Sequence, residues 1–157
     1  MEVDPRQRDE ILTMIPQQYP FRFLDRIVEL SEDAIVGTYR FREDEYFYRG
    51  HFPDYPVTPG VILIEAMAQT GVVAFGIFLL LMQGMSKDDV KKMVTLFATA
   101  DSIEFTSVVC PGEEVTIRGE KVYFRRGSLK TKVSMRRENG DLVCSGILSG
   151  KGVIVNE

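Results

Sequence analysis

Histidine and cysteine, the side chains that most often bind transition metals, are scarce in this sequence. It has one histidine, His51, and two cysteines, Cys110 and Cys144, which stand far apart and form no CxxC motif. A metal site needs a cluster of such ligands, so we expect no bound metal. Two distant cysteines also argue against a disulfide framework and favour a reducing compartment.

The sequence also lacks the usual marks of secretion and of nucleic-acid binding. Its first residues are acidic and include no apolar run, so we expect no signal peptide and a cytoplasmic location. The net charge of −4 gives no general attraction to nucleic acid. Basic residues do gather between positions 118 and 137, where they fit either a solvated strand face or a docking patch for an acidic partner.

One apolar segment, 61–82, approaches the length of a transmembrane helix. Glu65 and Gln69 lie inside it, and an acid in hydrocarbon is costly. The uninterrupted apolar part, 71–82, is too short to cross a bilayer alone. We therefore expect no membrane insertion and predict a helix buried inside a soluble fold.

The remaining pattern predicts one α+β domain over residues 1–157. A short amphipathic helix is expected at 6–15, and the long apolar helix should begin with Thr58 as its N-cap and end near Gln83, before one short helical turn within 86–92. Alternating residues predict strands at 23–30, 34–41, 93–109, 114–124, 128–137 and 142–155. The economical arrangement wraps one antiparallel sheet around the apolar helix, and the sheet face left bare predicts a dimer.

His51 and Glu65 are the candidate catalytic pair. Glu65 follows His51 by fourteen residues and lies two turns into the apolar helix, with Gln69 one turn further on the same face. Apolar neighbours should raise the pKa of Glu65, so that a neutral imidazole and a protonated acid are available for proton transfer. The free N–H of Gly60, at the helix N-terminus, could polarise a carbonyl group. Each residue also has a plain structural interpretation, as a surface histidine, a buried structural glutamate or a helix cap.

Five motifs follow one another along the chain: Ile15-Pro16-Gln17-Gln18-Tyr19-Pro20-Phe21, Leu24-Asp25-Arg26, Gly50-His51-Phe52-Pro53, Pro56-Val57-Thr58-Pro59-Gly60-Val61 and Glu65-Ala66-Met67-Ala68-Gln69. In this order they resemble the FabZ-type 3-hydroxyacyl-[acyl-carrier-protein] dehydratases of fatty-acid synthesis. Phe105 and Pro111-Gly112-Glu113 look like that family's later strand and turn. The resemblance implies a hot-dog fold, no cofactor, and dehydration of a (3R)-hydroxyacyl thioester on acyl carrier protein to the trans-2-enoyl product. It also implies a homodimer or a trimer of dimers.

The resemblance gives each candidate residue a role. His51 falls on the family's catalytic histidine, Glu65 on its catalytic carboxylate, and Gly60 on the glycine whose amide holds the thioester carbonyl. Gln69 would orient Glu65 or the released water, and an acyl tunnel would be lined by Phe52, Leu96 and Phe97. In this family the histidine and the carboxylate of one site come from different subunits. Glutamate at position 65 resembles the plain dehydratase branch, because the branch that also isomerises the double bond has aspartate there.

The chain departs from the family pattern at three places. Gln17-Gln18 stands where His-Arg is usual, no tyrosine lies between Lys92 and Phe105, and Thr106 and Ser107 replace basic residues. A specialised lipid or polyketide pathway therefore stays open beside fatty-acid synthesis.

Rival functions remain at this stage. They are a hot-dog acyl thioesterase, a non-catalytic dehydratase-like partner subunit and a coenzyme-A-linked hydratase, the last disfavoured because its Asp-x-x-x-x-His pattern is absent.

Overall fold

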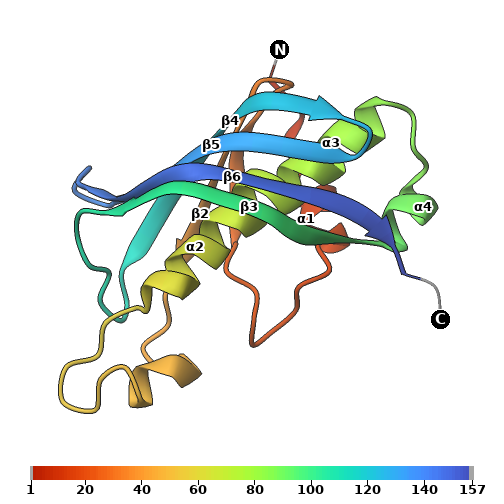
Figure 1. The fold of residues 1–157 in the computed structure, drawn as a ribbon. Coiled ribbons are helices and arrows are strands. Elements are labelled where there is room, and N and C mark those ends of the chain that lie inside the picture. Colours follow the sequence, from red (N-terminus) through yellow and green to blue (C-terminus); the bar gives the residue numbers. More distant parts are fainter. Residues whose placement is uncertain (1, 156–157) are drawn as a thin grey trace.

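A curved antiparallel sheet lies against one long helix (Figure 1). The computed structural model describes residues 2–155. The six strands have the order β1-β2-β4-β5-β6-β3, and their bounds are Arg26–Leu30 (β1), Ala34–Arg40 (β2), Met93–Phe105 (β3), Glu114–Arg125 (β4), Ser128–Arg137 (β5) and Leu142–Ile154 (β6). The predicted sheet wrapped around a central apolar helix, the hot-dog arrangement, is confirmed.

The central helix consists of three consecutive segments. These are α2 (Gly60–Ala68), a π-helical turn η2 (Gln69–Ala74) and α3 (Phe75–Met82). Its length and composition would suit a membrane span, but 78% of its most apolar window is buried inside the protein. The prediction of a buried core helix is therefore confirmed. The π-helical turn was not predicted, because a run that is apolar on all sides gives no periodic signal for one wider turn.

The start of this helix differs from the prediction. Pro59 is the N-cap and has no side-chain capping bond, so Gly60 is the first helical residue. Thr58 does not cap, because its hydroxyl is 2.7 Å from the Tyr48 hydroxyl and its amide donates to the Val109 carbonyl. Thr58 instead connects the start of the helix to the loop that precedes it.

The central helix packs against the sheet with its backbone in close contact. A Cβ atom on Gly119 of β4 would lie only 3.0 Å from the Cα atom of Gly71 in the π-helical turn. A Cβ on Gly71 would lie 2.8 Å from a methyl group of Val133 on β5. Since neither position has room for a side chain, the two glycines allow the helix to cross the middle of the sheet at this distance.

Two strand ends fall short of the predicted ranges for identifiable reasons. β1 begins at Arg26 rather than at 23, because the Phe23 amide donates to the side-chain oxygen of Gln69. β3 ends at Phe105 rather than at 109, because the amides of Thr106 and Ser107 both donate to the Val143 carbonyl and leave the ladder. The remaining helices are α1 (Pro5–Met14), the 3₁₀ turn η1 (Tyr46–Arg49) and α4 (Lys87–Lys91).

β3 is an open edge of the sheet. Within residues 2–155 it pairs with β6 alone, over thirteen residues. Its apolar side chains Leu96, Phe97 and Phe105 are about half exposed. A long edge strand with exposed apolar residues is a surface on which another strand can pair.

Candidate active site

Glu65 lies in α2 and is fixed by a hydrogen bond from the next helical turn. The Gln69 Nε2 group donates to Glu65 Oε2 at 2.7 Å, which confirms that the two side chains share a helix face. Burial raises the pKa of Glu65, and the bond from Gln69, which favours the carboxylate, opposes this shift. Since Oε2 accepts this bond, Oε1 is the oxygen that can carry the acid proton.

The amide of Gln69 is fully engaged by the protein. Its Oε1 accepts from the Phe23 amide at 2.6 Å, and its Nε2 donates both to Glu65 and to the Phe21 carbonyl at 2.8 Å. Gln69 is completely buried. Its geometry suits one of the two predicted roles, orienting Glu65, and the role toward released water stays a prediction.

His51 lies in the loop after η1, which extends beyond the end of the sheet in Figure 1. Its Nδ1 is 2.9 Å from the Val57 carbonyl oxygen, and a carbonyl can only accept, so Nδ1 carries a hydrogen. In the neutral ring this leaves a lone pair on Nε2, the atom that can act as a base. Phe52 stacks on the imidazole at a centroid distance of 4.2 Å.

Gly60 is placed at the N-terminal end of α2, five residues before Glu65. Among the described residues its N–H has no hydrogen-bond acceptor, as expected of a first helical residue. A Cβ at this position would lie 3.0 Å from the ring of Phe105. A side chain at position 60 would therefore collide with the Phe105 ring, and glycine avoids this collision.

A narrow cavity of about 30 Å³ opens beside Glu65. Its walls are formed by the pre-β1 segment, the central helix and β3, through Gln17, Glu65, Ala68, Val72, Val73, Thr95 and Phe97. Of the three predicted tunnel residues only Phe97 lies here. Leu96 follows Thr95 on the opposite face of β3, and Phe52 lies on His51.

One subunit does not bring the two catalytic candidates together. The cavity that Glu65 lines does not include His51, and within residues 2–155 no hydrogen bond joins their side chains. His51 belongs to the projecting loop, whereas Glu65 lies in the second turn of the helix.

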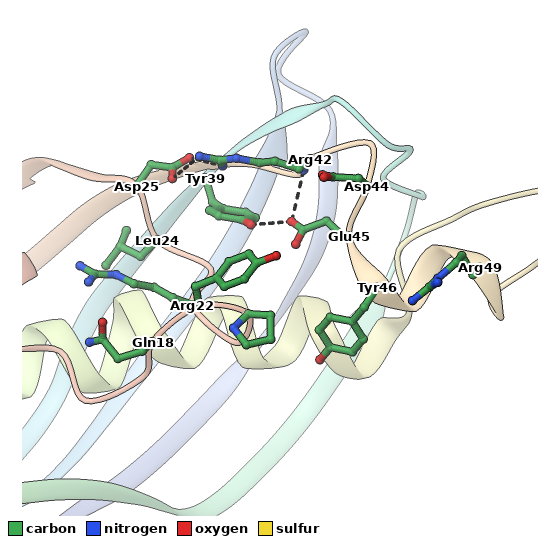
Figure 2. Close-up of a pocket in the computed structure, with 12 residues that line it drawn as sticks. Gln18, Arg22, Leu24, Asp25, Tyr39, Arg42, Asp44, Glu45, Tyr46 and Arg49 are labelled. Carbon is green, nitrogen blue, oxygen red and sulfur yellow. Dashed lines mark hydrogen bonds and ion pairs between the residues drawn. The ribbon is translucent and has the colours of Figure 1, made fainter.

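A wide hollow of about 690 Å³ lies elsewhere on the surface (Figure 2). Its lining includes neither His51 nor Glu65 and carries three arginines and three acids. Arg42 forms two hydrogen bonds to Asp25, and Tyr39 donates to Glu45, with burial raising the pKa of Tyr39. We interpret the hollow as a structural feature held by the Arg42–Asp25 ion pair and the Tyr39–Glu45 hydrogen bond.

Residues 15–146 match the family model described as a FabA-like domain. The FabZ 3-hydroxyacyl-[acyl-carrier-protein] dehydratase of Caldicellulosiruptor bescii is 37% identical over 89% of this chain and 94% of its own length. The corresponding FabZ of Clostridium perfringens is 33% identical over 88% of this chain and 92% of its own.

The chain belongs to the FabA-like family of FabZ dehydratases. Solved structures agree with this family in fold. The dehydratase heterocomplex ApeI:P from Xenorhabdus doucetiae aligns with a TM-score of 0.72 at 14% identity, over 99% of this chain and 93% of the other. A hypothetical thioesterase with coenzyme A from Streptococcus pneumoniae gives 0.56 at 12% identity, over 98% and 100%. At such identities the likeness concerns the fold alone.

Two features of this FabZ-family site were missed by sequence reasoning. The Tyr48–Thr58 hydroxyl pair holds the loop that contains His51, although a threonine before Pro-Gly indicates only a cap. Gln17 lines the cavity of Glu65, although 48 residues of sequence separate the two. The only sequence signal for this contact was that glutamine replaces the histidine usual at position 17.

Proposed function

We propose that His51 and Glu65 are the base and the acid of a 3-hydroxyacyl-[acyl-carrier-protein] dehydratase, a hydro-lyase of fatty-acid or related lipid synthesis. The observation that carries this proposal is Glu65, a carboxyl group whose pKa is raised by burial and whose Oε2 is held by Gln69. A carboxylic acid with a raised pKa is suited to protonate a departing hydroxyl group. Membership of the FabZ family supports the same reaction.

The proposed reaction is one sequence of bond changes. The Gly60 N–H polarises the thioester carbonyl and acidifies C2, and His51 Nε2 removes the C2 proton. The C–H electron pair forms the C2–C3 double bond while the C3–O bond breaks. Glu65 Oε1 transfers its proton to the departing hydroxyl, which leaves as water. The proton taken by His51 later restores the acid through solvent, so no net charge accumulates.

We expect the complete site to form between two subunits. One subunit keeps His51 apart from Glu65, and β3 offers a long open edge with exposed Leu96 and Phe97. Pairing of two β3 strands would extend the sheet and cover these side chains. A homodimer, or a trimer of such dimers, and a cytoplasmic location stay predictions.

Replacing either catalytic candidate tests the proposal. His51→Ala and Glu65→Gln should each lower turnover at least about a hundredfold, the usual scale for losing a general acid or base. Both side chains are partly exposed, so the thermal unfolding midpoint should stay close to that of the wild type. The assay is hydration of a crotonyl thioester, followed in parallel with thioester hydrolysis. Hydrolysis without hydration would support the thioesterase alternative, and wild-type turnover in either variant would refute the pair.

The carrier should dock on the basic end of the β4–β5 hairpin. Arg125, Arg126 and Lys151 line an open hollow there, together with Tyr123 and Ser128 and with no acidic residue of the described chain. Arg125 also stacks on Tyr123 at 4.7 Å. Such a surface suits an acidic carrier protein.

Reversing two charges tests whether the protein recognises the carrier protein or only a coenzyme A thioester. Arg125→Glu with Arg126→Glu should raise KM for carrier-linked substrate about tenfold or more and leave kcat within about twofold, because rim charges act on association. Reversal of Arg118 on the same strand is the matched control. An unchanged KM for the carrier-linked substrate would place docking elsewhere.

A further inference from the structure

Dehydration produces a water molecule beside Glu65, and this water needs hydrogen-bond acceptors. Before the C3–O bond breaks, the substrate hydroxyl has one hydrogen of its own, and the proton from Glu65 supplies the second. The Gln69 oxygen already accepts from the Phe23 amide, and its nitrogen already donates to Glu65 and to the Phe21 carbonyl. An acceptor that has no partner in the protein is better suited to orient the hydroxyl.

Gln17 carries such an acceptor. Its side-chain oxygen is buried and has no hydrogen-bond partner within the described residues. Gln17 also lines the same narrow cavity as Glu65, with Thr95 and Phe97 on the facing strand β3. A buried acceptor without a partner is costly to the folded protein unless a ligand supplies the missing donor.

We propose that Gln17 is a substrate-positioning residue whose Oε1 accepts a hydrogen bond from the C3 hydroxyl of the 3-hydroxyacyl chain. This inference rests on the proposed function. The bond turns a hydroxyl lone pair toward the protonated Oε1 of Glu65, and after the C3–O bond breaks it holds the released water between the two residues. Gln17 thereby selects acyl chains that carry the hydroxyl over saturated chains of the same length.

Binding measured without turnover tests this selection directly. In a His51→Ala background, which removes the base, the affinity for 3-hydroxyacyl and for saturated acyl carrier-protein thioesters of equal length is measured by calorimetry. Adding Gln17→Met, similar in length but without an acceptor, should weaken hydroxyacyl binding about fivefold to tenfold, the scale of one hydrogen bond. Binding of the saturated chain should stay unchanged. Gln17→His keeps an acceptor nitrogen and should restore most of the difference.

Two further measurements distinguish positioning from a structural role. Gln18→Met is the matched control, because the Gln18 side chain donates to the Ile15 carbonyl and lines the other hollow. Removing an unpaired buried acceptor should leave the unfolding midpoint of Gln17→Met unchanged or higher, whereas loss of a structural bond would lower it. Equal weakening for both chains, or no weakening, would overturn the inference while leaving the dehydratase intact. A wild-type protein without dehydration or hydration activity would overturn both.

Discussion

The side chain of Gln69 joins the acid of the site to the segment that precedes β1. Its bond to Glu65 stabilises the carboxylate, so Gln69→Met should raise the pKa of Glu65 further. Because the protonated acid then persists to higher pH, the alkaline limb of the kcat profile should shift upward. The Phe21 carbonyl and the Phe23 amide would lose their partner, at about 1–3 kcal/mol of unfolding free energy each. A pH–rate profile and a urea titration measure both, and a downward shift of the limb would contradict this account.

At this scale the sequence predicted the residue types of the site better than their partners. The raised pKa of Glu65 and the Glu65–Gln69 pair follow from helical spacing inside an apolar run. The partners of Gln69 in the segment before β1 do not, because 46 and 48 residues separate them from it. The contact of His51 with Val57 likewise depends on how the loop folds back.

At the scale of the elements, the helix and the sheet come into close backbone contact where Gly71 faces Gly119. A methyl group on Gly119 would press on backbone rather than on a flexible side chain, so Gly119→Ala should destabilise the fold by about 1–3 kcal/mol. Gly50→Ala is the control, because a Cβ there meets nothing within 4 Å and the glycine has a φ of −102°. Thermal unfolding of the two variants measures the difference. Equal midpoints would show that the helix can shift without cost.

Element types were predictable, but several element boundaries were not. Turn residues and alternation located all six strands and the long helix. Thr58 looked like an N-cap because local sequence cannot reveal that Tyr48 occupies its hydroxyl. The end of β3 at Phe105 depends on the Val143 carbonyl, which lies far along the chain.

For the whole molecule, mixing two inactive variants tests the shared site. His51→Ala subunits retain Glu65, and Glu65→Gln subunits retain His51. After refolding together, about half of the dimers should be mixed, and each would contain one intact site and one doubly altered site. Activity should therefore recover to about a quarter of the wild-type value. Heterodimers confirmed by mass spectrometry but without recovered activity would place both residues of each site in one subunit.

The π-helical turn Gln69–Ala74 also fixes the angular phase between the two halves of the central helix. A π turn holds one residue more than the α-helical turn it replaces, and each α-helical residue advances the helix by about 100°. If the same six residues formed regular α-helix instead, the extra residue would rotate α2 against α3 by about that angle. Glu65 would then turn away from Thr95 and Phe97, while α3 kept its place in the core. The direction in which the acid points is thus set by the width of a helical turn that does not include it.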